Sequence, residues 1–391
     1  MFKPLLCCLV VLSGAYAINH GTQAADFAAY MARFGKTYAT AAEQNAAQYY
    51  YNYHKNQIAQ QNALADRGAS SYRVNENQFS DIRLITFAAR LPQAVYPATS
   101  GSTTPVTPND VAPAEFDLLK QWGVEVFAPD QGTVCSSSWA YAVARSIQIL
   151  NAIQVGQDVP LNNSAQALID CAGMGNGCTT QVPQIAFDYL RQAGVFLVNE
   201  AEYPPNKTQN QQGMCLPQMA ASPIKLETYG TIPDGDDDLL MRYVASEVPV
   251  IVEYNPATFG FMHYSSGVYV PPMRAQASSS QFLVVVGYGH DAASNLDYWR
   301  CLNSFGNTWG ENGFIRIVRS AAQPLAKRAI FPNSLGAIAT TPSTPTTPST
   351  PTTPSTTAPS STPPSSSTPS TSSSSTTTTT TTAAPSTTIT P

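Results

Sequence analysis

Ser138 is the residue of this chain that is best placed to act as a nucleophile. It lies in the segment QGTVCSSSWAY, Gln131–Tyr141, where a serine cluster gives way to apolar residues at helical spacing. The pattern therefore predicts that Ser138 stands in the first turn of a helix that the serine cluster can cap. Because the N-terminus of a helix favours a developing anion, this position suits nucleophilic catalysis.

A nucleophilic serine needs a base, because its hydroxyl otherwise stays protonated. The chain has four histidines, and two of them, His20 and His54, precede the segment in which the folded domain is expected. No motif places His263, in FGFMHYSSG, so we interpret it as an exposed or packed side chain. His290 follows the glycine pair of VVVGYGH. None of the four is an evident partner of Ser138.

The elements around Ser138 predict an α+β fold with segregated halves. Apolar residues at helical spacing run over 137–154, and β-branched runs of strand length follow at 248–253, 282–286 and 314–318. A helix first and strands later, without βα alternation, indicates separate helical and β parts.

Composition divides the chain into five parts. Residues 1–17 carry one Lys, an apolar run and a small-x-small cleavage site, which predicts a secretory signal peptide. Residues 18–91 read as helical, and 92–112 as an exposed Pro/Thr/Ser-rich linker. The folded domain is expected over 113–325. Residues 326–391 are mostly Thr, Ser and Pro, and predict a disordered, mucin-like O-glycosylated tail.

Charge and cysteine count limit the environment and the partners. A net charge of -5 with no basic cluster argues against nucleic acid or an anionic membrane. Of seven cysteines, Cys7 and Cys8 leave with the signal peptide, and five remain. An odd number in an oxidising compartment indicates two disulfides and one free thiol. We therefore expect a secreted, extracellular protein with no membrane span.

No cofactor or metal is expected. The acidic run DGDDD, Asp234–Asp238, lacks the spacing of a calcium-binding loop. Acidic residues at the start of a helix before Leu239 and Leu240 explain it better.

The chain resembles the papain-like cysteine protease family from about Ala24 to Ser320. Beyond the Gln131–Tyr141 loop, the resemblance rests on SAQALIDC at Ser164–Cys171 and on YWRCLNSFGNTWGENGFIRI at Tyr298–Ile317. It implies a two-lobe domain, one lobe helical and one β-barrel-like with a cleft between them, preceded by an inhibitory helical prosegment. The residues that match the prosegment patterns of the family are Glu43, Tyr51, Ile58, Asn62, Asn77, Phe79 and Asp81.

Mapped onto this sequence, the resemblance implies that two of the three central catalytic residues have been replaced. Ser138 stands where the family has its nucleophilic cysteine, and Gln281 stands where it has the catalytic histidine. Asn303 keeps the role of the orienting asparagine. Glutamine cannot serve as a general base, and losing such a nucleophile–base pair typically costs about 10⁶-fold in rate. His290 lies nine residues past Gln281, so an extended strand would place it roughly 30 Å away.

The cleft departs from the family pattern as well. Thr180 and Gln181 stand where the family usually has two glycines, which let a substrate backbone approach closely. An extra residue, Val134, puts the oxyanion role of Gln131 in question, and Phe305 replaces a tryptophan that shields the catalytic pair. The residues expected around the cleft are Ser136 (a glycine in the family), Ser137, Trp139, Thr180, Gln181 and Phe305.

The resemblance also implies a disulfide pairing, Cys135 with Cys178 and Cys171 with Cys215. Cys301 would then be the free thiol, and we interpret it as an inert core residue. Asn162 and Asn206 begin acceptor sequons for N-glycosylation.

Three functions are compatible with these residues. We favour a secreted, non-peptidase homologue of a papain-like protease that acts as a binding or decoy module for peptides, protease inhibitors or related proteases. The alternatives are an active peptidase that uses Ser138 with an unidentified base, and a mucin-like extracellular structural glycoprotein. Because an inactive domain cannot remove its own prosegment, we expect the prosegment to remain docked in the cleft.

Overall fold

The computed structural model describes most of the chain between residues 23 and 336. The described ranges are 23–96, 107–108, 110–155, 162–173, 175–192, 195, 197–205, 211–216 and 224–336. The predicted signal peptide, most of the predicted linker, the sequon at Asn206 and nearly all of the predicted tail lie outside these ranges.

The N-terminal segment is mostly helical, with one short strand. A helix over residues 23–34 is followed by α2 (Ala41–Asp66), β1 (Tyr72–Val74) and α3 (Leu84–Ala89). The hydroxyl of Thr40 caps α2 by accepting from the N–H of Glu43. The segment was expected to be helical, and β1 interrupts its helices because those residues pair with the domain.

The helical lobe of the domain surrounds the long central helix. It comprises α4 (Leu118–Trp122), α5 (Ser138–Val155), α6 (Ala165–Ala167), a π-helical turn (Leu168–Ala172) and α7 (Pro183–Leu190). Fifteen residues of α5, from Ser138 to Ala152, are buried. The start of the central helix is thereby held rigidly inside the protein.

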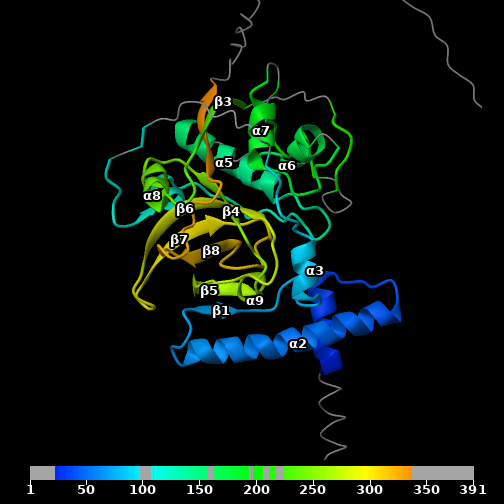
Figure 1. Cartoon of the computed structure of the whole chain (residues 1–391). Coiled ribbons are helices and arrows are strands. Elements are labelled where there is room, and N and C mark those ends of the chain that lie inside the picture. Colours follow the sequence, from blue (N-terminus) through cyan, green and yellow to red (C-terminus); the bar gives the residue numbers. More distant parts are fainter. Residues whose placement is uncertain are drawn as a thin grey trace, which may run out of the picture. The chain divides into compact units, whose positions relative to one another are not determined.

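The β lobe is built from strands with two short helices between them. Its elements are β2 (Phe116–Asp117), β3 (Lys225–Thr231), α8 (Asp237–Ala245), β4 (Val250–Tyr254), α9 (Phe259–Met262), β5 (Tyr264–Tyr269), β6 (Gln281–Asp291), β7 (Leu296–Leu302), β8 (Phe314–Val318) and β9 (Ile330–Gly336). In the described part the sheet runs β1-β5-β8-β7-β6-β4-β9-β3, and β2 pairs with β6. The predicted α+β fold with segregated lobes is confirmed (Figure 1).

The N-terminal segment docks by extending this sheet. β1 pairs antiparallel with β5, and α2 lies alongside β1 (Figure 1). Gly267 of β5 has a φ of 88°, and a Cβ at this position would lie 2.3 Å from the carbonyl oxygen of Ser71. The close approach of the two backbones therefore requires glycine at this position.

Two predicted boundaries are wrong. The folded domain was expected to end at residue 325, but β9 pairs with β3 and β4, and Ile330 and Phe331 are buried. The short apolar run AIF, between charged residues and the Pro/Ser/Thr-rich segment, is too brief to stand out as a strand. The linker was expected to be exposed from Pro92, but Ala94 is buried and Tyr96 is half-buried against the domain.

Candidate functional site

Ser138 and Gln281 meet where the two lobes join. Ser138 is the first residue of α5, and Gln281 is the first residue of β6. The hydroxyl oxygen of Ser138 accepts a hydrogen bond of 3.2 Å from the N–H of Phe282. Both side chains are completely buried. The sequence-predicted pair is therefore brought to one place.

The carboxamide of Gln281 is the centre of a buried hydrogen-bond network. Its Nε2 lies 2.7 Å from Asn303 Oδ1, 3.1 Å from Gln131 Oε1 and 3.1 Å from Ser304 Oγ, and its two hydrogens are shared among these three acceptors. Ser304 Oγ in turn donates to Gln131 Oε1 at 2.6 Å. The network joins Gln131, ahead of α5, to the residues that follow β7.

Two atoms of this network have no hydrogen-bond partner in the described structure, Gln281 Oε1 and Asn303 Nδ2. Asn303 Oδ1 accepts from Gln281 and also from the N–H of Ser304, at 2.8 Å. Because Asn303 Oδ1 and Gln131 Oε1 both need donors, the amide of Gln281 is held with its nitrogen toward them. Ser304 was not singled out from the sequence, although its position next to Asn303 was a usable signal.

No base accompanies Ser138 in the described structure. Its hydroxyl makes no hydrogen bond there to a carboxylate, an imidazole or an amine. A serine hydroxyl in this setting stays protonated, and an amide cannot accept its proton at neutral pH. The arrangement links residues of the two lobes, and among the described residues the hydrogen-bond partner of the Ser138 hydroxyl is a backbone N–H.

His263 is directed at another histidine instead of at Ser138. Its ring lies 4.7 Å from the ring of His54, which comes from α2, and 4.7 Å from that of Phe259. Neither ring nitrogen of His263 has a partner in the described part, and burial lowers its pKa to about 3. His54 binds the carbonyl of Ser80 through Nδ1 at 2.9 Å, and burial lowers its pKa as well. No motif in the sequence indicated this pair, because its members lie far apart in the chain and belong to different parts of the fold.

Ser136, Thr180 and Gln181, which stand where the family usually has glycines, make hydrogen bonds within the protein. Ser136 Oγ and Thr180 Oγ1 share a hydrogen bond of 2.5 Å, and both residues are buried. The amide of Gln181 donates to the carbonyl of Asn176 at 3.2 Å. Ser137 donates to the carbonyl of Cys135, and the indole of Trp139 donates to that of Gly177.

Phe305 packs against the N-terminal segment. Its ring lies 5.0 Å from Phe79 and 5.9 Å from Phe87, and 5.5 Å from Trp309 of the domain. The residue next to the Gln281 network is therefore part of the docking surface for the prosegment. Val134, the extra residue of the loop, is exposed.

The chain after α3 lies along the residues that precede Gln281. The N–H of Ser280 donates to the carbonyl of Leu91 at 3.2 Å, and the N–H of Ala94 donates to Ser280 Oγ at 3.0 Å. The N-terminal segment therefore contacts the residue that immediately precedes Gln281.

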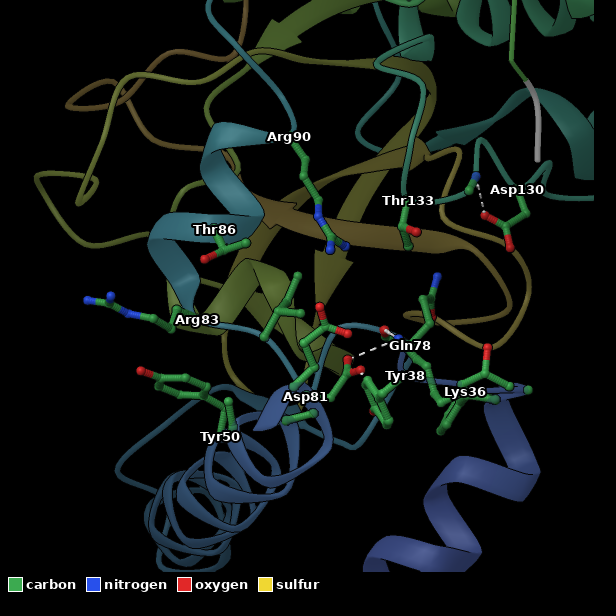
Figure 2. Close-up of a pocket in the computed structure, with 18 residues that line it drawn as sticks. Lys36, Tyr38, Tyr50, Gln78, Asp81, Arg83, Thr86, Arg90, Asp130 and Thr133 are labelled. Atoms are coloured by element: carbon green, nitrogen blue, oxygen red, sulfur yellow. Dashed lines mark hydrogen bonds and ion pairs between the residues drawn. The ribbon is translucent and has the colours of Figure 1, made fainter. Parts of the chain in front are cut away.

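A second hollow lies between the N-terminal segment and the loop before α5. Its volume is about 690 Å³. In Figure 2, Arg90, just after α3, points into this cavity, and Asp130 and Thr133 lie on the side opposite α3. Asp81 is held there by Lys36 at 3.0 Å and by the hydroxyls of Tyr30 and Tyr38, each at 2.9 Å. Three cations and three carboxylates line the cavity: Lys36, Arg83, Arg90, Glu43, Asp81 and Asp130. The formal charges of these six side chains sum to zero.

The cysteines form the disulfides that the resemblance implied. Cys135 is bonded to Cys178, and Cys171 to Cys215. Cys301 is a free, completely buried thiol on β7, and burial raises its pKa well above the usual range. Asn162 is half-buried and accepts from the amide of Gln148 at 3.4 Å.

The acidic run begins a helix, as predicted. Asp236 caps α8 by accepting from the N–H of Leu239 at 2.9 Å. Among the described residues, no group of three or more His, Cys, Asp or Glu could hold a metal ion. Within the same residues, no helix has the length and apolar character needed to cross a membrane.

Comparison with known proteins identifies the protein family of this chain. The family described as "Papain family cysteine protease" matches residues 112–332. The chain is 31% identical over 308 residues to the probable cysteine protease RDL6 of Arabidopsis thaliana, covering 76% of this chain and 81% of that protein. It is 29% identical over 302 residues to cathepsin L of Sarcophaga peregrina, covering 74% and 86% of the two chains.

Solved structures agree in fold. The digestive procathepsin L2 proteinase from the larval midgut of Tenebrio molitor superposes with a TM-score of 0.70 at 26% identity, covering 80% of this chain and 100% of that chain. Procathepsin L 3 from the same tissue gives a TM-score of 0.69 at 26% identity, with coverage of 80% and 99%. The likeness spans the N-terminal segment as well as the domain.

Proposed function

Because this chain belongs to the papain family of cysteine proteases, we propose that it is a secreted member without peptidase activity, which acts as a binding or decoy module. The positions at issue are Ser138, Gln281 and Asn303. In this proposal the chain keeps the fold of the enzyme, but it has lost the catalytic pair of cysteine and histidine.

The observation that carries the proposal is the fixed amide of Gln281. A base beside Ser138 would need a free lone pair and a pKa near the working pH. Gln281 offers an amide nitrogen that is already engaged with Gln131, Asn303 and Ser304. Without a base, a nucleophile at this position could draw only on oxyanion stabilisation and substrate binding for catalysis.

The docked N-terminal segment supports a role that does not depend on turnover. β1, Phe79 and residues 91–96 all contact the domain. If the domain cannot cut this segment, then the segment stays in place until another protease removes it. The docked form and the released form would present different surfaces, which suits a module that binds peptides, inhibitors or related proteases.

Secretion and glycosylation of the tail are proposed from the composition of residues 1–17 and of the residues after 336. The leader pattern over residues 1–17 supports secretion, and the Thr/Ser/Pro-rich residues after 336 support an O-glycosylated extension. The extension would carry the domain away from whatever surface or matrix it joins. Domain and extension are compatible parts of one secreted glycoprotein.

The proposal is tested by restoring the two missing groups. The purified chain is compared with Ser138→Cys, Gln281→His and the double variant, with fluorogenic peptides as substrates and with iodoacetamide labelling of residue 138. A Cys–His pair should give a reactive thiolate. We expect turnover and rapid labelling in the double variant alone.

Turnover by the unmodified chain would overturn the proposal. If the double variant folds but remains inactive after its N-terminal segment has been cut, then the changes at Thr180 and Gln181 have also closed the cleft. The variant Thr180→Gly/Gln181→Gly in the same background separates this loss of access from a loss of chemistry.

A further inference from the structure

We propose that Ser279, Ser280 and the buried Glu253 form a peptide-binding site that selects a tyrosine side chain, and that Tyr96 of the same chain occupies it in this structure. The inference rests on the proposed function as a binding module, and it names the class of ligand. The ligand is an extended peptide with a tyrosine at a fixed distance from its backbone contacts.

The backbone of the occupant is held by two consecutive serines. The carbonyl of Leu91 accepts from the N–H of Ser280 at 3.2 Å and from the hydroxyl of Ser279 at 2.6 Å. Three residues later, the N–H of Ala94 donates to Ser280 Oγ at 3.0 Å. These contacts use main-chain atoms of the occupant, so they fix its register and would accept many sequences.

Selectivity comes from the buried carboxylate of Glu253. The hydroxyl of Tyr96 donates to Glu253 Oε2 at 3.2 Å, and the hydroxyl of Ser280 donates to Oε1. Glu253 lies on β4 and is only 5% exposed. A buried carboxylate needs donors, and a phenylalanine at position 96 would remove one of them. Burial raises the pKa of Tyr96, so its phenol keeps the proton that it donates.

Two cations next to Glu253 decide between a tyrosine and a basic side chain. Lys327 Nζ lies 3.9 Å from Glu253 Oε2, and the guanidinium of Arg328 lies 4.5 Å from the centre of the Tyr96 ring. An incoming Lys or Arg would meet both positive charges. A phenol is a neutral donor, and its ring face attracts the guanidinium. The site therefore fits tyrosine better than any cation.

The spacing of Leu91, Ala94 and Tyr96 also defines the sequence pattern expected of a peptide ligand. In LPQAVY, Leu91–Tyr96, the buried Leu91 side chain packs with the β-lobe core, and the small side chain of Ala94 is buried against the helical lobe. The pattern is an apolar residue, a small residue three positions later and a tyrosine two positions after that. Peptides with this pattern are the expected ligands once the chain's own segment leaves.

The test removes the contacts of Ala94 and Tyr96 with this site in the full-length chain, and then measures the binding of added peptides. Ala94→Pro/Tyr96→Ala removes the N–H donor and the phenol of the occupant, while the rest of the chain is kept. Fluorescently labelled acetyl-LPQAVY-amide is titrated by polarisation, beside analogues that end in Phe or Lys. We expect the Tyr peptide to bind about 10-fold more tightly than either analogue.

Glu253→Val in the opened chain should abolish this preference, so that the Tyr and Phe peptides bind within about two-fold of each other. Glu227→Val, at an exposed glutamate of β3, is the matched control and should leave the preference intact. A second measurement does not depend on the opened variant. In the otherwise unmodified chain, Tyr96→Phe alone should speed hydrogen exchange at the amide of Ala94.

Equal or tighter binding of the Phe or Lys peptide would overturn the inference. So would a tyrosine preference that survives Glu253→Val, unchanged exchange at Ala94 in Tyr96→Phe, or absence of binding in an opened chain that keeps its circular dichroism. Mass spectrometry of the bound peptide separates this inference from the proposed function. A cleaved Tyr peptide would refute the loss of peptidase activity and still leave the tyrosine preference in place.

Discussion

The carboxamide of Gln281 and an imidazole at the same position would act differently on Ser138. An imidazole could take the hydroxyl proton, whereas the amide is committed to three buried oxygens. The motif predicted the positions of Ser138, Gln281 and Asn303 because each lies in a short segment of the sequence. The network around them could not be predicted, because it depends on Gln131 and Ser304 arriving from two separate loops.

At the scale of single residues, we predict that removing the side-chain amide of Gln281 lowers the stability of the fold. Gln281→Leu should lower the free energy of unfolding by about 1–3 kcal/mol, because the buried oxygens of Gln131 and Asn303 each lose one of their two donors. Urea unfolding followed by tryptophan fluorescence measures it. Gln60→Leu, at an exposed position of α2, should change stability by less than about 0.5 kcal/mol. A loss in Gln281→Leu no larger than in this control would show that the network contributes nothing.

At the scale of elements, contacts between the N-terminal segment and the domain account for most differences between expectation and structure. Residues 92–96 read as linker from their composition, yet Ala94 is fixed by Ser280. β9 was assigned to the tail, yet it pairs with β3. In both cases the local sequence is unremarkable, and the partner that orders it lies elsewhere in the chain. The strands at 282–286 and 314–318 were predictable because their apolar runs are long enough to stand alone.

The histidine pair makes docking of α2 dependent on pH. When α2 is docked, the pKa of His263 is about 3, against 6.5 for a free histidine, and that of His54 is also lowered. The released form therefore binds more protons, so docking is fully stable above pH 6.5 and weakens as the pH falls toward 3. At pH 5 the loss from His263 is at most about 2 kcal/mol, a value reached when release exposes its ring completely. Asp81, the nearest acidic group, favours protonation of His54 and offsets part of this penalty.

Hydrogen exchange of α2 amides at pH 7 and pH 4.5 measures this effect. Exchange corrected for intrinsic rates should be faster at pH 4.5, and His263→Phe should remove most of the difference. His290→Gln is the control, because His290, on β6, is exposed and bonded to Asp297 of β7. Equal pH dependence in His263→Phe and in the unmodified chain would contradict the assignment.

At the scale of the whole molecule, the described structure has the architecture of the procathepsin L structures, with the N-terminal segment docked on the domain, and we propose that the domain does not remove this segment itself. The family resemblance predicted this architecture, because its motifs recur in order along the chain. The Leu91–Tyr96 contacts and the His54–His263 pair are particular to this sequence, and they emerge only when segments distant in the chain are brought together.

Maturation is predicted to stop at the signal peptide. When the chain is secreted by a protease-deficient host cell and purified without protease inhibitors, N-terminal sequencing should give a single start at Ile18. The double variant Ser138→Cys/Gln281→His is the matched comparison, and it should be trimmed to a start near Pro113. A start near Pro113 in the unmodified chain would show that the domain cuts itself.

The central claim is that Ser138 performs no catalysis, and the most direct measurement compares the unmodified chain with Ser138→Ala. Both proteins are incubated with a peptide library from pH 4 to pH 8, a range that includes the conditions under which α2 is expected to loosen, and the products are counted by mass spectrometry. We predict that the two proteins give the same background of cleavage at every pH. Cleavage by the unmodified chain that is lost in Ser138→Ala would contradict the account.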